Sequence, residues 1–268
     1  MKTYDFKKFD VSIIQNNSSI CMIAKRNSGK SWLVRDIIYQ KRDIPAFVVI
    51  APTDKLSGFY NEFIPSSYIY YEYDTHILTK IFKRQEMLIQ KNKERKKEGK
   101  QEIDTRLMLI MDDCLASKQI WSKDQNIYEL LQNGRHYHIT YILTMQYSLG
   151  VSPELRSNFD FIFLLGEDFV SNQKRLYDHY AGMFDSFDIF KKIFIAVTDN
   201  YGCMVLNSQV KSKEITDKVF WYKAKNHEKF NVGGSKYIEY HKTNFNNNWK
   251  NKNKGITIND NFKFNLEK

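Results

Sequence analysis

Between about residues 19 and 206, short runs of β-branched and aliphatic residues alternate with longer segments whose apolar residues recur at helical spacing. Several of the short runs are apolar at consecutive positions, which is typical of strands that are covered on both faces. This rhythm predicts an α/β domain with a central, mostly parallel sheet flanked by helices. The five expected strands of that sheet lie at residues 20–24, 46–51, 107–111, 139–144 and 160–165.

Two later apolar runs, at residues 193–197 and 202–206, are separated by the turn-forming sequence DNYG. We expect them to form a hairpin at the end of the core. A long segment between the second and third strands has the apolar spacing of a helix, and it ends in KNKERKKEGK at residues 91–100. That charged stretch is either the solvated end of a helix or a basic projection that faces DNA.

After about Lys211 the composition shifts towards lysine, asparagine and aromatic residues, with few aliphatic ones. We therefore divide the chain into a core, residues 1–210, and a basic C-terminal extension, residues 211–268, which we expect to be extended and partly ordered. From Lys223 onward the chain has ten lysines against four acidic residues. Aromatic residues that interleave with these lysines would suit a surface that stacks bases or packs on a neighbour, or they pack against the core. They are Trp221, Tyr222, Phe230, Tyr237, Tyr240, Phe245 and Trp249.

The composition narrows the class of protein. In 268 residues, 41 Lys and Arg against 31 Asp and Glu give a net charge of +10, and 42% of residues are hydrophobic. This composition excludes a disordered chain and favours a polyanionic partner. Three widely separated cysteines exclude a disulfide framework and a zinc cluster. The first residues lack an apolar signal core, and no stretch approaches the roughly 20 apolar residues of a membrane span, so we expect a protein that is neither exported nor membrane-spanning.

The sequence AKRNSGKS follows the first expected strand and precedes a helical pattern. Strand, tight loop and helix start in this order are the context of a P-loop, and the match to GxxxxGK[ST] fails only at the first glycine. Backbone N–H groups and the helix dipole would surround the phosphates of ATP, Lys30 would neutralise their charge, and the Ser31 hydroxyl would bind Mg²⁺. The expected nucleotide-binding residues are Ala24, Lys25, Arg26, Asn27, Ser28, Gly29, Lys30, Ser31 and Trp32.

The third expected strand ends in Asp112 and Asp113, at the edge of the sheet where ligands of open α/β folds bind. Adjacent strand residues point to opposite faces, so the two carboxylates can serve different tasks. We expect Asp112 to hold Mg²⁺, and Asp113 to orient and deprotonate the attacking water. The fourth strand leads into Gln146 at the same edge, where a polar side chain could report the state of the γ-phosphate.

Two arginines are candidates for stabilising charge in the transition state. Arg135 precedes the fourth strand and Arg156 follows it. An arginine finger places a delocalised cation beside the transferring phosphoryl group and is often supplied by a neighbouring subunit. Each of the two could instead be the partner in a structural ion pair. A finger that acts in trans would require an oligomer.

This constellation resembles the packaging ATPases of nucleocytoplasmic large DNA viruses, the A32-like branch of the FtsK/HerA superfamily. The resemblance covers the core to about Leu206 and rests on the P-loop, the strand into the two aspartates, GRH before the strand that ends at Gln146, and LRSN at residues 155–158. Two positions depart from the family pattern. Ala24 replaces the first glycine, and the second acid is Asp113 where many members have glutamate.

The resemblance implies a RecA-like P-loop NTPase that assembles into a ring of identical subunits, a pentamer or a hexamer. It further implies hydrolysis of ATP coupled to pumping double-stranded DNA into a preformed capsid, with capsid or vertex proteins as further partners. The expected location is the viral factory in the host cytoplasm, and also the virion.

Two other functions fit the same residues. One is a P-loop helicase or recombination-type ATPase that acts on single strands. The other is a binding protein that holds nucleotide without turnover while the basic extension anchors DNA or capsid protein. A P-loop that begins with Ala24 keeps this last alternative open, because alanine tolerates a left-handed backbone poorly.

Overall fold

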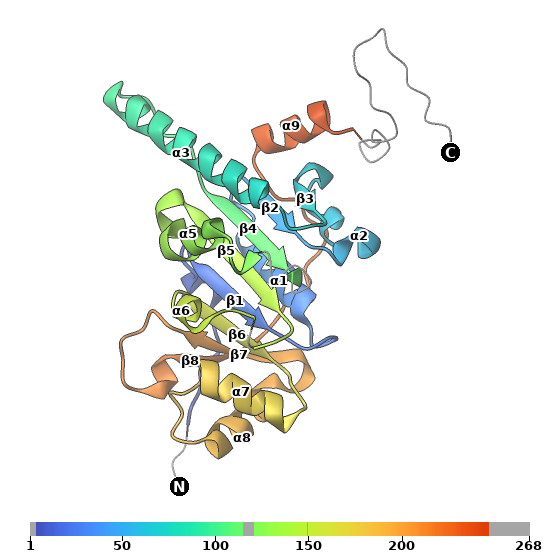
Figure 1. Cartoon of the computed structure of the whole chain (residues 1–268), viewed down its shortest axis with the longest axis vertical. Helices are drawn as coiled ribbons and strands as arrows, with labels where there is room; N and C mark the ends of the chain where they lie inside the picture. Colours follow the sequence, from blue (N-terminus) through green and yellow to red (C-terminus); the bar gives the residue numbers. More distant parts are fainter. Residues whose placement is uncertain (1–3, 115–120, 149, 247–268) are drawn as a thin grey trace.

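One eight-stranded sheet organises the computed structural model, which describes residues 4–114, 121–148 and 150–246 (Figure 1). Its strand order is β3-β2-β4-β5-β1-β6-β7-β8; the first six strands pair in parallel, and β7 is antiparallel to both of its neighbours, β6 and β8. The mostly parallel α/β architecture expected from the sequence is confirmed. The strands are β1 (Ser19–Ile23), β2 (Phe47–Ile50), β3 (Ile69–Tyr70), β4 (Leu107–Asp112), β5 (Ile139–Met145), β6 (Phe161–Leu165), β7 (Gly202–Asn207) and β8 (Val219–Lys223).

Helices connect and cover the strands, and α5, α6 and α7 lie in front of the sheet in Figure 1. The described α-helices are α1 (Lys30–Gln40), α2 (Asp54–Ser57), α3 (Thr75–Lys97), α5 (Gln125–Asn133), α6 (Pro153–Arg156), α7 (Val170–Tyr180), α8 (Phe187–Thr198) and α9 (Ser235–Asn244). Short 3-10 helices occupy Val11–Ile13, Tyr60–Glu62, Ser66–Tyr68, Gly134–Tyr137, Asp199–Tyr201 and Ile215–Asp217. In the described part of the chain, no helix combines the length and apolar character that a bilayer crossing demands.

The central strands are covered on both faces, as their continuous apolar runs predicted. Every residue of β2, β4, β5, β6 and β7 is buried. Burial on both faces favours the β-branched and aliphatic residues that these strands contain. The carboxyl ends of the parallel strands therefore sit on a rigid, fully packed sheet.

The predicted strand at residues 193–197 is wrong, because these residues lie in α8. The Ser186 side chain accepts a hydrogen bond from the Ile189 amide and begins the helix. Phe190 and Phe194, four residues apart, are fully buried on one face of the helix. A short apolar run cannot be assigned to a strand or a helix by its pattern alone, and here the helix spacing prevails. The sequence 199–202 therefore links α8 to β7.

The antiparallel partner of β7 is β8, which comes from the C-terminal extension. In that extension Val219, Tyr222, Val232 and Tyr237 are buried in the core. The Tyr237 hydroxyl donates a hydrogen bond to the carbonyl of Phe47, at 2.9 Å, and its ring stacks on another tyrosine. Residues 219–244 thus complete the packing of the core. The Asn/Lys-rich stretch from residue 247 onward, including Trp249, lies outside the described residues.

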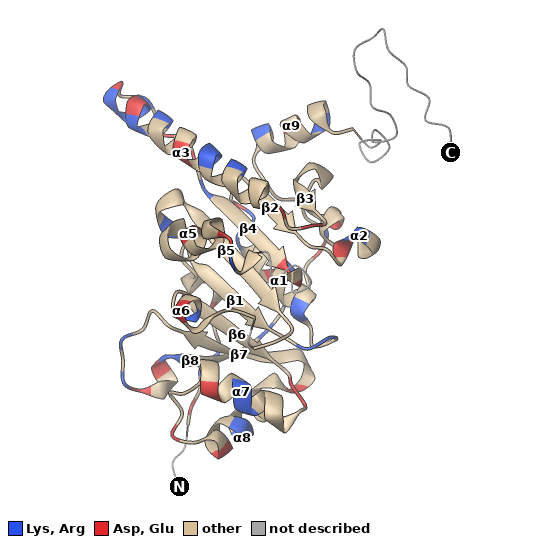
Figure 2. Ribbon diagram, viewed as in Figure 1, with Lys and Arg blue, Asp and Glu red and all other residues tan. Residues whose placement is uncertain are grey.

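The helix expected between the second and third strands is confirmed as α3, which extends beyond the body of the protein (Figure 1). Ile77, Leu78 and Ile81 are buried in its first half. Its last turn contains Arg95, Lys96 and Lys97, and the ribbon at this far end is coloured mostly for Lys and Arg, with acidic residues among them (Figure 2). The contact with DNA that we considered for this end remains a prediction.

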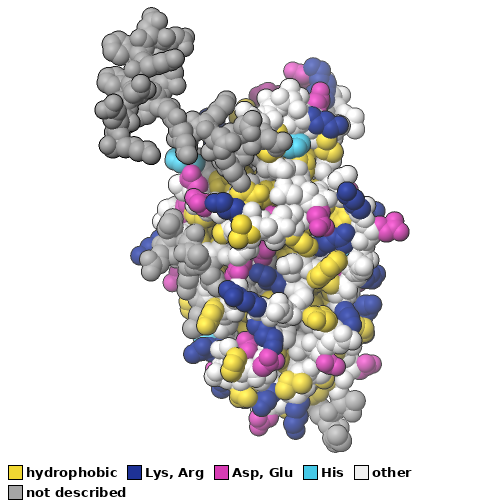
Figure 3. Space-filling view, turned by 90° about the vertical axis from the view of Figure 1, so that its right-hand side faces the viewer, with side chains coloured by type: hydrophobic (Ala, Val, Ile, Leu, Met, Phe, Trp, Pro, Cys, Tyr) yellow, Lys and Arg dark blue, Asp and Glu magenta, His cyan; other side chains and the backbone are white. Residues whose placement is uncertain are grey.

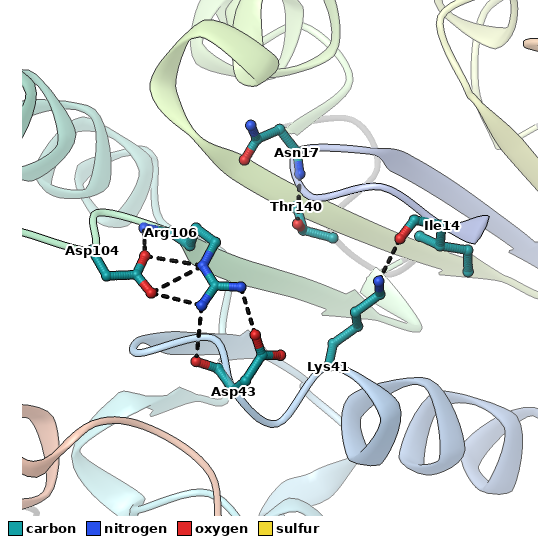
Figure 4. A network of polar contacts seen from close by, with 7 residues as sticks. All are labelled: Ile14, Asn17, Lys41, Asp43, Asp104, Arg106 and Thr140. Carbon is teal, nitrogen blue, oxygen red and sulfur yellow. Dashed lines mark hydrogen bonds and ion pairs between the residues drawn. The ribbon is translucent and has the colours of Figure 1, made fainter. Parts of the chain in front are cut away.

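Polar contacts fix the edge of the sheet at which the parallel strands begin (Figure 4). The Arg106 guanidinium binds the carboxylates of Asp104 and Asp43, both at 2.6 Å. These hydrogen bonds raise the pKa of Arg106 and lower the pKa of Asp104. The Lys41 ammonium, which follows α1, donates to a backbone carbonyl in the N-terminal segment. Charged side chains at this edge therefore hold neighbouring loops together through ion pairs and hydrogen bonds.

Candidate active site

The loop that connects β1 to α1 has the backbone of a phosphate-binding turn. Asn27 and Gly29 adopt left-handed conformations, with φ of 60° and 92°. Ala24 is not among the described residues with positive φ, and its amide donates to the carbonyl of Met145 at 2.9 Å. Alanine therefore fits the first position of the loop without strain, because asparagine and glycine take the left-handed positions. The Ser28 hydroxyl closes the turn by donating to the carbonyl of Lys25, at 2.7 Å.

Lys30 begins α1, and its side chain reaches across to β4 and β5. Its Nζ lies 3.0 Å from Oδ1 of Asp112 and 3.2 Å from Oγ1 of Thr144. The Thr144 hydroxyl donates to Asp112 and accepts from the backbone amide of Asp113. The Lys30 side chain is only 13% exposed and that of Asp112 only 8%. This geometry holds a cation and an anion together in a setting where solvent screens little.

The two aspartates at the end of β4 have different hydrogen-bond partners, although Asp113 lies just beyond the strand and strand alternation does not govern its direction. Asp113 has a left-handed backbone, with φ of 53°. Its carboxylate accepts a hydrogen bond from Nε2 of Gln146, the residue after β5. Asp112 thus contacts the P-loop lysine and Thr144 of β5, while Asp113 contacts Gln146 just after that strand. The structure brings Asp113 and Gln146 together from positions 33 residues apart.

These groups line one cavity of about 900 Å³ at the carboxyl edge of the sheet. Figure 3 views the molecule from the right-hand side of Figure 1 and shows Lys and Arg side chains across the middle of that face. The cavity is large enough for a nucleotide, since ligand pockets are typically about 300–1,000 Å³. Its lining is Lys25, Arg26, Asn27, Gly29, Lys30, Ser31, Trp32, Thr53, Asp112, Asp113, Gln146, Tyr201, Lys223, Ala224, Lys225 and Asn226.

Several residues of the site were not predicted from the sequence. Thr144 could have been found from the register of the sheet, because it lies directly opposite Asp112 on β5. Three further parts of the lining belong to no sequence motif: Thr53, Tyr201 and the segment 223–226. They reach the cavity because Thr53 follows β2, Tyr201 precedes β7, and the segment lies at the end of β8. No pattern in the sequence indicates that these residues belong to the site.

The donor set at this edge suits Mg²⁺. Ser31 and Asp112 offer a hydroxyl and a carboxylate oxygen to the same cavity. Mg²⁺ prefers oxygen ligands and is usually held by one or two protein groups together with substrate phosphates and water. Within the described ranges, no three His, Cys, Asp or Glu side chains are grouped to hold a metal by themselves. The predicted role of Ser31 and Asp112 therefore fits the chemistry of the residues present.

Cys114 directly follows the two aspartates, but its thiol is not a candidate nucleophile. It is buried, and its Sγ contacts the carbonyl of Ile50 at 3.4 Å. Burial raises the pKa of Cys114, and the negative charges of Asp112 and Asp113 raise it further. A protonated, enclosed thiol is a poor nucleophile.

Neither candidate arginine lines the cavity. Arg135 is exposed in the 3-10 helix that precedes β5, at the opposite edge of the sheet from the P-loop. Arg156 is half-buried at the end of α6, where its Nε donates to the carbonyl of Val151 at 2.9 Å. Its guanidinium also lies over the ring of Tyr180, at 5.6 Å. Within one chain, the structure does not bring either arginine to Lys30.

Comparison with known proteins places the chain among viral proteins. No family model matches it. It is 48% identical to the uncharacterised protein L437 of Acanthamoeba polyphaga mimivirus over 243 residues, 91% of this chain and 85% of that protein. It is 37% identical to the uncharacterised protein 088R of Invertebrate iridescent virus 3 over 212 residues, 78% and 77% of the two chains. The chain belongs to this family of viral proteins.

Solved structures share the fold at low sequence identity. The genome packaging NTPase B204 of Sulfolobus turreted icosahedral virus 2, in complex with sulfate, matches with a TM-score of 0.54 and 16% identity, over 80% of this chain and all of B204. ATPases 2 and 3 of EssC from Geobacillus thermodenitrificans match with a TM-score of 0.51 and 12% identity, over 85% of this chain and 43% of that one. The RecA-like P-loop NTPase fold predicted from the sequence is confirmed.

Proposed function

We propose that this protein is an ATPase that drives double-stranded DNA into a viral capsid, a member of the A32-like branch of the FtsK/HerA superfamily. The observation that carries the proposal is one cavity in which Lys30 meets Asp112 and Gln146 meets Asp113, at the end of a P-loop. Viral relatives support it, as does a shared fold with a protein named as a genome packaging NTPase.

The loop and the helix that follows it bind the triphosphate in this mechanism. Backbone N–H groups between Lys25 and Ser31, together with the amino end of α1, face the phosphate oxygens. The Lys30 ammonium, already oriented by Asp112 and Thr144, lies beside the β and γ groups. Mg²⁺ held by Ser31 and Asp112 would supply further positive charge where negative charge develops.

Asp113 provides the base. Its carboxylate accepts the proton of the attacking water, and the hydrogen bond from Gln146 fixes the direction in which that carboxylate points. Gln146 is thereby placed to sense whether the γ-phosphate is present, since a displaced Asp113 would release its amide. The two side chains come from neighbouring strands β4 and β5, so such a movement would pass into the sheet.

We assign the charge-stabilising arginine to a neighbouring subunit of a ring, of five or six copies. Arg156 and Arg135 both lie away from the cavity of their own chain. Arg156 is the better candidate, because its guanidinium is already oriented by a backbone carbonyl and a tyrosine ring. Capsid or vertex proteins are the further partners proposed, with action in the viral factory of the host cytoplasm and in the virion.

The net charge of +10 supports a polyanionic binding partner, and we propose that this partner is duplex DNA. The test is the ATPase rate of the full chain with and without long duplex DNA. We expect several-fold stimulation by duplex, weakening as salt rises, because phosphate contacts release counterions. Lys30→Ala should abolish both the basal and the stimulated rate.

Single-stranded DNA of the same length is the matched comparison. Equal stimulation by both forms, together with strand separation, would indicate the helicase alternative instead. Nucleotide binding without any turnover, under all of these conditions, would indicate the binding-protein alternative.

A further inference from the structure

The cavity continues well beyond the groups that act on the γ-phosphate. Asp112, Asp113 and Gln146 lie at the ends of β4 and β5, on one side of the P-loop strand β1. The remaining wall lies on the other side, at β7 and β8, and contains Tyr201 and residues 223–226. Because β7 and β8 run antiparallel with Gly202 opposite Lys223, these two pieces of wall are neighbours.

The positions of these two sides of the cavity determine the direction in which a bound nucleotide would lie. A nucleotide is a linear molecule with its triphosphate at one end and its base at the other. If the γ-phosphate lies towards β4 and β5, the base must extend towards β7 and β8. The groups available there determine how the base is held.

Tyr201 occupies this part of the cavity in an unusual backbone state. Its φ is 62° and that of Asn200 is 48°, both in the left-handed region that bulky residues avoid. Gly202 is required after them, since a Cβ there would lie 2.2 Å from the carbonyl oxygen of Val197. The turn nevertheless leaves the Tyr201 side chain 65% exposed. Strain of this kind gathers at ligand sites, where it aims a side chain.

The Tyr201 side chain also lies beside the phosphate loop. A Cβ at Gly29 would lie 3.5 Å from Cβ and Cδ1 of Tyr201. The aromatic face therefore begins where the phosphate cradle ends, which is the place at which a ribose and base continue from a bound triphosphate.

The neighbouring piece of wall, residues 223–226, is held firmly to α1. Asp36, fully buried in that helix, accepts hydrogen bonds from the Tyr222 hydroxyl at 2.7 Å and the Lys225 amide at 2.8 Å. Nε2 of His227 lies 2.6 Å from the same carboxylate, and its ring stacks on Tyr39. Residues 223–226 are thereby fixed relative to the P-loop, with Lys225 and Asn226 exposed beside the cavity.

We propose that Tyr201 and the segment 223–226 form the subsite for the base and ribose of the nucleotide, with the base stacked on the Tyr201 ring. Asn226 supplies polar groups that face the base edge or the ribose. This inference rests on the proposed nucleotide binding at Lys30. It makes the C-terminal extension a part of the nucleotide site.

The test compares ATP with inorganic tripolyphosphate, which has the phosphates and no base. Calorimetry on the full chain would give the Kd of each ligand for wild type, Tyr201→Ala and Tyr201→Phe. We expect Tyr201→Ala to weaken ATP binding roughly ten-fold, as loss of a base–aromatic stack does, with tripolyphosphate unchanged. Tyr201→Phe keeps the ring and should bind both ligands as wild type does.

Asn226→Ala provides a second variant, with Glu228→Ala as its matched control, because Glu228 is exposed two residues further along the chain and does not line the cavity. We expect Asn226→Ala to bind ATP several-fold more weakly than wild type and Glu228→Ala to bind it with wild-type affinity. Wild-type ATP affinity in Tyr201→Ala, or equal losses for ATP and tripolyphosphate, would overturn the subsite. A wild-type protein that binds neither ligand would instead contradict the proposed function.

Discussion

At the scale of single residues, the site depends on a few polar groups that are held before any ligand arrives. Lys30, Asp112 and Thr144 form a closed set of contacts, and the amide of Asp113 joins it through the same threonine hydroxyl. Each group is therefore oriented by another, which reduces the rearrangement that catalysis requires.

Asp113→Asn tests whether Asp113 is the general base while Asp112 serves as the Mg²⁺ ligand. Asparagine keeps the size of the side chain and its contact with Gln146, but it cannot accept a proton from water. We expect ATP turnover to fall at least 100-fold, in line with the contribution of a general base, while the Kd for ATP changes little. Steady-state ATPase assays and calorimetry measure the two quantities.

Lys30→Ala is the comparison for this variant, because it should lose binding as well as turnover. Turnover by Asp113→Asn at the wild-type rate would assign the base to another residue.

At the scale of elements, α1 links the P-loop to the segment that follows β8. Its amino end begins the P-loop site, and Asp36 in its middle holds the segment that follows β8. Arg35 adds a hydrogen bond to the carbonyl of Glu228, at 3.2 Å, and a stacking contact with Phe230. The C-terminal extension is thus attached to the helix that carries the phosphate site.

Asp36→Ala should destabilise the fold. The substitution leaves the Tyr222 hydroxyl and the Lys225 amide without their acceptor, and an unsatisfied buried donor costs about 1–3 kcal/mol. We expect the free energy of unfolding to fall by about 2–4 kcal/mol, measured by urea denaturation with circular dichroism.

Asp178→Ala is the matched control, since Asp178 pairs with Lys174 on an exposed face of α7. Exposed pairs of this kind contribute roughly 0–1 kcal/mol. Equal unfolding midpoints for the two variants would show that Asp36 does not fasten the extension.

At the scale of the whole molecule, neither candidate finger, Arg135 or Arg156, lies beside the phosphate site of its own chain. Lys30 and Asp112 are in one cavity, and Arg156 is outside it. If Arg156 completes the site of a neighbour, each active site is shared between two subunits and the ring is the active species.

Mixing two inactive variants tests this arrangement. Arg156→Ala subunits keep an intact P-loop, and Lys30→Ala subunits keep the arginine. We expect mixtures to recover a fraction of wild-type ATPase activity, because some interfaces combine the two intact halves. Activity is measured across mixing ratios, with Arg135→Ala in place of Arg156→Ala as the comparison. Mixtures that assemble into rings yet stay inactive would exclude Arg156 as a finger acting in trans.

The sequence by itself determined the features that depend on neighbouring residues. The P-loop is eight consecutive residues between a strand and a helix, so its order predicts its geometry. Five of the six parallel strands were predicted because burial on both faces demands continuous apolar runs, whereas the two-residue strand β3 was not predicted. Asp112, Asp113 and Gln146 were predicted because they directly follow such runs, and carboxyl ends of parallel strands meet at one edge.

Only the tertiary structure decided the features that depend on which strands are neighbours. The run at 193–197 became α8 because two phenylalanines four residues apart face the core, while the partner of β7 came from residues 219–223. Tyr201 and Asn226 enter the cavity because β7 and β8 pair beside it. Local pattern carries no information about such pairing, because packing between distant segments fixes it. This pairing closes one side of the cavity.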